Sequence, residues 1–204
     1  MKFSLKHNSM KQIETYGYRK TIPDEIYFQV LETLSYYPEL KNTPITFRFK
    51  NPQEQIIMSA QPVFKTLFRV LDERAYYVNI SRTIKLGSDS MKIEDLPKDV
   101  LIGWLGHELG HLMDYKDRSA WGMIKFGIGY LLFPNFVKGA ERKADEYAVQ
   151  HGLGNYIVKT KNYILNHAEI PLSYKEKMKK LYLSPEEIMQ MVDTDQQSTV
   201  SPAI

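Results

Sequence analysis

The pattern of apolar and polar positions predicts an α+β protein that is mostly helical and has a small mixed sheet. Apolar residues recur at a helical spacing in four segments. Alternating or β-branched and aromatic positions predict strands over residues 44–50 and 74–84. Residues 86–90 read as a loop. The four predicted helices cover residues 23–36, 62–74, 94–115 and 137–151.

Local start and stop signals refine these elements. Gly152 and Gly154 predict the end of the helix over residues 137–151. Ser173-x-x-Glu176 and Ser184-x-x-Glu187 each fit a capping box and predict two short C-terminal helices. Residues 193–204 are polar and are expected to fray.

Composition bounds the class of protein. The 204 residues, 43% of them hydrophobic and 25% charged, predict one globular domain over residues 1–192 followed by the polar tail 193–204. The 27 basic and 24 acidic residues leave a net charge of +3, which argues against nucleic-acid binding through bulk charge. The chain has no cysteine, which excludes disulfides and cysteine-ligated zinc.

One apolar run, Ala120–Val137, resembles a membrane segment only in part. Lys125 and Pro134 interrupt it, and its uninterrupted apolar part is shorter than the roughly 20 residues that a spanning helix needs. We expect a buried or partly covered hairpin, with a shallow membrane or partner contact as the alternative. The first residues, Met1–His7, lack the apolar core of a signal peptide, so a cytoplasmic location is expected, with peripheral membrane association left open.

The candidate chemistry lies in His107-Glu108-Leu109-Gly110-His111, an H-E-x-x-H sequence within the predicted helix 94–115. Two histidines four residues apart on a helix point the same way and can bind one metal ion. Catalytic zinc takes three protein ligands and leaves a position for water. The pattern therefore predicts one Zn²⁺ per chain with Glu108 as the general base.

Two residues compete for the third ligand position. Asp117 follows His111 by six residues, as in a metzincin-type site, but that site needs a glycine where this chain has Asp114. A continuing helix would carry Asp117 past the metal. Glu141 is preferred, because Asp145 follows it by four residues and both side chains then face one way. Asp145 can accept the free N–H of a ligating histidine.

The pairing of HELGH with Glu141-x-x-Ala144-Asp145 resembles the gluzincin metallopeptidases, most closely the group of the HtpX and CAAX prenyl proteases. This resemblance implies a zincin-like fold, zinc ligands at His107, His111 and Glu141, and a supporting role for Asp145. The small residues Ala144 and Ala148 would let their helix pack closely on the helix with the histidines. ImmA/IrrE-type peptidases have a similar motif pair, but continue with an apolar stretch where this chain has Val149–Gly154.

The resemblance implies zinc-dependent cleavage of a peptide or protein substrate. Glu108 would take a proton from the attacking water and pass it to the leaving amine. The strand Tyr76–Ser81 would be the edge strand to which an extended peptide adds. A regulatory peptidase of the ImmA/IrrE kind, acting on or binding a transcriptional regulator, is the alternative, and a purely structural zinc site is a third.

A second donor to the developing oxyanion is also expected. The candidates are Tyr147, His151, His167 and Tyr174. His151 is the preferred catalytic candidate because it ends the helix that carries Glu141. A histidine at a helix C-terminus is also favoured by the helix dipole alone, which leaves a purely structural role open.

Overall fold

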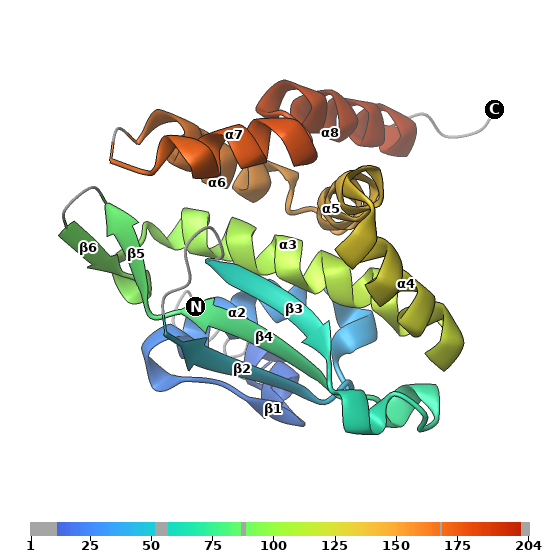
Figure 1. Ribbon diagram of the computed structural model, residues 1–204. Coiled ribbons are helices and arrows are strands. Elements are labelled where there is room, and N and C mark those ends of the chain that lie inside the picture. Colours follow the sequence, from blue (N-terminus) through green and yellow to red (C-terminus); the bar gives the residue numbers. More distant parts are fainter. Residues whose placement is uncertain (1–11, 52–56, 87–88, 168, 201–204) are drawn as a thin grey trace.

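The computed structural model describes residues 12–51, 57–86, 89–167 and 169–200 and shows an α+β fold (Figure 1). The strands are β1 (Lys20–Thr21), β2 (Ile45–Lys50), β3 (Met58–Pro62), β4 (Tyr76–Ser81), β5 (Thr83–Leu86) and β6 (Asp89–Lys92). The α-helices are α2 (Tyr27–Ser35), α3 (Lys98–Lys116), α4 (Ala120–Leu132), α5 (Pro134–Gln150), α6 (Gly154–Asn166), α7 (Leu172–Leu181) and α8 (Pro185–Val200).

Four strands form a mixed sheet in the order β1-β2-β4-β3. The first three run parallel, and β3 pairs antiparallel with β4. The predicted small mixed sheet is confirmed. The prediction that Tyr76–Ser81 is the edge strand is wrong, because β4 lies between β2 and β3 and both of its edges are paired. Strand β3 was not predicted, because its five residues show little apolar alternation; it forms one edge of the sheet, and β1 forms the other.

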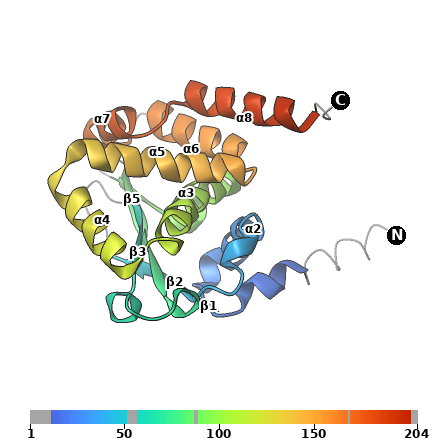
Figure 2. The same cartoon turned by 90° about the vertical axis from the view of Figure 1, so that its right-hand side faces the viewer.

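One face of this sheet is apolar and the other is polar. Ile45 and Phe47 of β2 are buried, as are Val78 and Ile80 of β4. Helices α2 and α3 lie on one side of the sheet, and α5 to α8 form a layer above α3 (Figures 1 and 2). On the opposite face the Arg48 guanidinium stacks 3.5 Å from the ring centroid of Tyr77, which is typical of a solvated surface. The sheet therefore packs against the helices through its apolar face only.

The predicted helix over residues 62–74 is wrong. The structure has only short 3-10 turns there, at Phe64–Thr66 and Leu71–Glu73. The Val63 N–H donates to the Ala75 carbonyl across the strand pair, at 2.8 Å, so the start of the segment belongs to the sheet. Four apolar residues, Val63, Leu67, Val70 and Leu71, recur at helical spacing in this segment, but only Leu67 is buried.

The segment Ala120–Val137 forms α4 and the first turn of α5. Phe133 between them is extended, as expected for a residue before Pro134. Met123 and Phe126 are buried, but many other apolar side chains of this segment are exposed, so it is covered on one side only. None of the described helices is long and apolar enough to cross a membrane.

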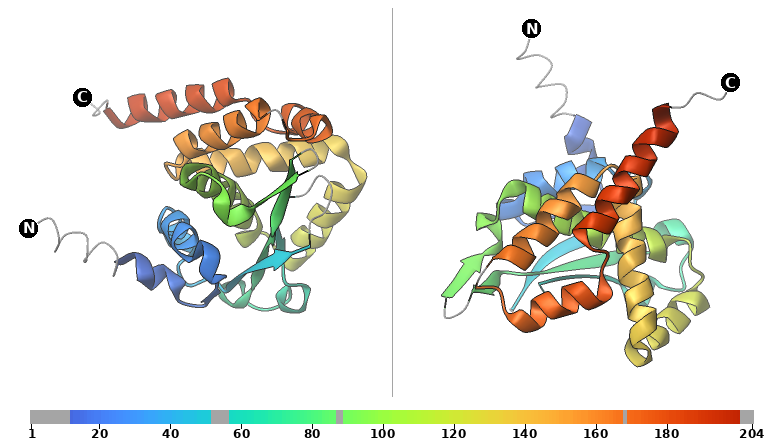
Figure 3. Two further views of the ribbon diagram at one scale, coloured as in Figure 1. Left: turned by 90° about the vertical axis from the view of Figure 1, so that its left-hand side faces the viewer. Right: turned by 90° about the horizontal axis from the view of Figure 1, so that it is seen from above.

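The C-terminal helices depart from prediction in detail. Gly152 ends α5 with a φ of +79°, as expected, but Gly154 begins α6, which the sequence analysis missed. Ser173 lies inside α7 and caps nothing, because Pro171 precedes that helix. The Ser184 box is confirmed by bonds of 2.7 and 3.2 Å with Glu187. Helix α8 continues to Val200, beyond the point where fraying was expected, and lies across α5 and α6 (Figure 3).

Close packing of α5 on α3 depends on a glycine within the H-E-x-x-H sequence. A Cβ atom at Gly110 would lie 2.3 Å from the Ala144 carbonyl oxygen, which is backbone and cannot move aside easily. Ala144 and Ala148 are both fully buried. The expected role of small residues at this contact is confirmed, and it brings the two motifs together.

We predict that Gly110→Ala destabilises the protein by about 1–3 kcal/mol through overpacking. Gly139→Ala is the matched control, because a Cβ there meets nothing within 4 Å and the change should stabilise helix α5 by up to about 1 kcal/mol. Urea unfolding of both variants in the presence of a metal chelator measures the difference in their free energies of unfolding. Equal stability of the two variants would contradict the packing argument.

Candidate metal centre

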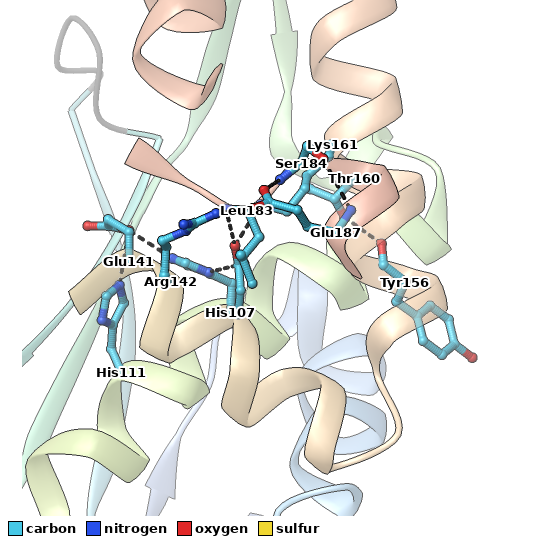
Figure 4. Close-up of polar contacts among 11 residues, drawn as sticks. His107, His111, Glu141, Arg142, Tyr156, Thr160, Lys161, Leu183, Ser184 and Glu187 are labelled. Carbon is cyan, nitrogen blue, oxygen red and sulfur yellow. Dashed lines mark hydrogen bonds and ion pairs between the residues drawn. The ribbon is translucent and has the colours of Figure 1, made fainter. Parts of the chain in front are cut away.

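Three buried side chains converge between α3 and α5. His107 and His111 lie on one face of α3, and Glu141 projects from α5 toward them (Figure 4). Glu141 Oε2 lies 3.1 Å from His107 Nε2 and 3.3 Å from His111 Nε2. One potential ligand atom from each residue lies within 4.8 Å of the others. Zinc bonds nitrogen and oxygen at about 2.0–2.2 Å, so the ligand atoms of one ion lie roughly 3–4 Å apart. The two distances from Glu141 Oε2 to the histidine nitrogens fall within this range.

Asp145 connects this cluster to the rest of the fold. Its Oδ1 accepts from His107 Nδ1 at 2.9 Å, which leaves His107 Nε2 facing Glu141. Its Oδ2 accepts from Lys161 Nζ of α6 at 2.8 Å and from the Leu183 backbone N–H at 3.2 Å. The Ser184 capping box fixes the chain next to Leu183. The predicted role of Asp145 as partner of a ligating histidine therefore fits its contacts.

The charges buried here balance only through protonation or a bound cation. The buried carboxylates of the described residues are Glu108, Glu141 and Asp145, which together carry a charge of −3. Lys161, the buried lysine at the site, contributes +1, so with neutral histidines the site carries −2. Buried charge is costly unless it is compensated. A divalent cation would neutralise the remainder, so the donor set fits the predicted ion in charge as well as in type.

The pKa values of His107 and Glu141 also show that the site favours positive charge. Burial opposes protonation of His107, but its hydrogen bonds to Asp145 and Glu141 raise its pKa to about 10. Burial opposes ionisation of Glu141, yet the two histidines hold the pKa of its carboxyl well below the usual range. The geometry thus favours a cationic group, either a proton or a metal ion, between His107 and Glu141.

Tyr130 of α4 determines which oxygen of Glu141 faces the histidines. Its hydroxyl donates to Glu141 Oε1 at 2.6 Å, while Oε2 is the oxygen near both imidazoles. The carboxylate is therefore oriented to offer one oxygen to an ion. The sequence analysis missed Tyr130, since 14 tyrosines offer no signal that singles it out.

Glu108 is buried beside the cluster, and its Oε2 has no hydrogen-bond partner among the described residues. Burial raises the pKa of its carboxyl, an effect that the nearby histidines and the Ala60 backbone N–H partly offset. Glu108, His111 and Glu141 line a cleft of about 500 Å³. The cleft is bounded by β3 on one side and by Phe126 and Tyr130 of α4 on the other. Such a volume is typical of a ligand site.

Two residues weighed in the sequence analysis lie away from this cleft. Asp117 is the C-cap of α3, six residues and about 9 Å along the helix axis from His111. His151 lies ten residues after Glu141 on α5, about 15 Å along its axis. Its Nδ1 lies 2.7 Å from the Tyr147 carbonyl oxygen, and its ring stacks on Tyr37. The assignment of His151 as an oxyanion donor is therefore withdrawn, and its place at the helix C-terminus accounts for it.

Of the other three candidate donors, one lies at the cluster and two do not. Tyr147 and His167 are absent from the linings of both cavities at the cluster, whereas buried Tyr174 lines a narrow cavity next to Glu108. The sequence analysis did not single out Tyr115 and Tyr182, which line the main cleft. Burial raises the pKa of both hydroxyls, so they remain protonated donors at neutral pH.

Comparisons with family models, curated proteins and solved structures give no match to this chain.

We predict that Glu141→Gln lowers zinc affinity by about 100-fold or more, because losing a partner of a ligand already costs 10–100-fold. Asp117→Asn is the control and should leave affinity unchanged. Competition with a chromophoric chelator measures both, with circular dichroism to confirm folding. Loss of affinity in Asp117→Asn together with normal affinity in Glu141→Gln would overturn the assignment of Glu141.

Proposed function

We propose that this chain is a zinc-dependent endopeptidase of the gluzincin type. The observation that carries the proposal is the position of the Glu108 carboxylate. It lies buried, with one unpartnered oxygen, next to His111 and Glu141 on the floor of an open cleft. A structural zinc site is closed by a fourth protein ligand. Within the described residues the metal-ligand group has three members, which supports a catalytic rather than a structural site.

When bound, zinc supplies Lewis acidity, which polarises a substrate carbonyl and lowers the pKa of a water molecule toward about 7. Glu108 accepts the proton from the attacking water and delivers it to the leaving amine. Its raised pKa suits this exchange, because a general base works best when its pKa is near the working pH. Asp145 and Tyr130 hold His107 and Glu141 in place, and the Tyr115 and Tyr182 hydroxyls are the donors available to a developing oxyanion.

The outer edge of β3 pairs with no strand among the described residues, which supports a peptide as substrate. Ile57 O accepts from Ser81 N, and Val63 N donates to Ala75 O, so odd-numbered residues pair with β4. Backbone groups alternate along a strand, so Met58 and Ala60 present an N–H and a carbonyl to the other edge, along the cleft, and Pro62, which has no N–H, presents its carbonyl alone. The Ala60 N–H already interacts with Glu108. An extended peptide that pairs with this edge would pass directly over the cluster.

We predict that Glu108→Gln retains zinc and loses about 100-fold or more of the peptidase rate, because glutamine is isosteric but cannot accept the proton. Glu146→Gln is the control. Glu146 lies on α5 in a partly exposed pair with Lys143, and its loss should leave the rate unchanged. Digestion of casein and of a quenched-fluorescent peptide library measures turnover. Undiminished cleavage by Glu108→Gln, or no cleavage by the zinc-loaded protein, would contradict the proposal.

Pairing with β3 predicts a pattern in the substrate. Once a cleaved peptide is found, N-methylation of the residues whose N–H groups pair with β3 should lower kcat/KM by about tenfold or more each, since each bond and its geometry are lost. Methylation at the intervening residues should have little effect. Kinetics on a full N-methyl scan measure this, and a uniform response along the peptide would argue against strand addition.

A further inference from the structure

One side of the molecule carries an apolar surface that no described part of the chain covers. We call it the α4 face. It combines exposed side chains of α4 and of the turn that follows with exposed side chains of the loop 64–71, which lies beside the start of α4 in two perpendicular views (Figures 1 and 2). Its members are Phe64, Phe68, Val70, Leu71, Trp121, Ile128, Leu131, Leu132, Phe133 and Phe136. Exposed apolar side chains on neighbouring segments mark a candidate interaction site.

Helix α4 is packed on its inward side, and its outward side has no cover among the described residues. The inward side of the helix is complete, because Met123 and Phe126 are buried and Phe126 packs edge-on against Tyr115, with ring centroids 5.2 Å apart. The outward side is also apolar, and Leu131 is 84% exposed. A helix that is apolar all round is normally covered on every side. Helix α4 is covered on one.

The charged residues within the two segments that form this face are all basic. Between Ser119 and Ala140 the charged residues are Lys125 and Lys138, both exposed. Between Pro62 and Leu71 they are Lys65 and Arg69, also exposed. The acidic residues nearest in sequence lie just outside these segments, at Asp72, Glu73, Asp117 and Glu141. Cations interspersed with tryptophan, phenylalanine and leucine are typical of elements that lie in the headgroup region of anionic membranes.

We propose that the α4 face docks on the surface of an anionic phospholipid bilayer, with α4 lying in the plane of the headgroups. Its 13 residues span about 20 Å, too short to cross the hydrocarbon layer. Exposed Trp121 at the start of α4 suits the interface, where aromatic side chains gather. A second copy is a poorer occupant, because a two-fold contact would bring these cations near their own equivalents.

Docking in this way would place the mouth of the cleft next to the lipid surface. Leu131 belongs to both features, since it lines the cleft and is the most exposed large apolar residue of α4. Tyr130, one residue earlier, holds Glu141. Helix α4 thus joins the proposed membrane surface to the metal centre. The docking itself stands independently of the proposed peptidase activity, because it rests on surface residues alone.

The experiment is flotation of the full-length protein with vesicles of phosphatidylcholine alone or mixed with phosphatidylglycerol. We expect binding to the mixed vesicles and a blue shift of tryptophan fluorescence. Trp104 is buried and Trp121 is 69% exposed, so the shift should disappear in Trp121→Phe. Lys125→Glu/Lys138→Glu should remove the preference for anionic lipid. Absence of binding to both kinds of vesicle would overturn the proposal.

The apolar contribution is tested with Ile128→Gln/Leu132→Gln, which changes two exposed residues outside the cleft lining. Each aliphatic side chain that is buried in the lipid contributes to the free energy of binding, so the partition coefficient of the double variant onto vesicles should fall at least about tenfold. Phe28→Gln is the control, because Phe28 is similarly exposed on α2, on the other side of the molecule (Figure 2). An equal loss of vesicle binding in Phe28→Gln would overturn the proposal in favour of non-specific adhesion. A dimer that the double variant dissociates, with no vesicle binding by the unmodified protein, would overturn it in favour of a second copy.

Discussion

The structure around the two motifs depends on one constraint, the compensation of negative charge that is buried between α3 and α5. Glu108, Glu141 and Asp145 are removed from water together, and Lys161 balances only one of them. Hydrogen bonds carry no charge themselves, so protonation or a bound cation must supply the remainder. They can only direct the carboxylates toward a common point, as Tyr130 does for Glu141 and as Leu183 and Lys161 do for Asp145. A divalent ion at that point would satisfy the cluster, and three of its residues could hold one.

The fold can be understood as the support for this cluster. Gly110 lets α5 approach α3 until the Ala144 backbone lies against it, and this contact places Glu141 opposite the two histidines. Helix α6 brings Lys161 to Asp145, and the cap at Ser184 fixes the backbone that donates to the same carboxylate. On the other side of α3, β3 leaves a backbone edge free along the cleft. Helix α4 has two roles in this arrangement, because it contributes Tyr130 to the centre and an apolar face to the surface.

Spacing within the sequence was sufficient to predict the parts of the site that depend on local geometry. The i, i+4 pairs His107/His111 and Glu141/Asp145 each lie on one face of a helix, and the structure brings the four residues together. Residues that reach the site through tertiary packing, such as Tyr130 and Lys161, carry no local signal. His151 was misassigned because it shares a helix with Glu141, although ten residues of helix separate them. In the sheet, β3 was missed because its pairing with β4 rather than an apolar alternation defines it, and this error placed the edge at the wrong strand.

The central claim is that a divalent ion bound by two imidazoles and one carboxylate balances the buried charge. Zinc-edge X-ray absorption of the protein loaded with one equivalent of Zn²⁺ tests this most directly. The account predicts a four- or five-coordinate site with nitrogen and oxygen scatterers near 2.0–2.2 Å, the multiple-scattering signature of two imidazoles, and loss of one oxygen scatterer in Glu141→Gln. A spectrum without two imidazole ligands, or one that is unchanged in His107→Ala, would show that the ion binds elsewhere and would contradict the account.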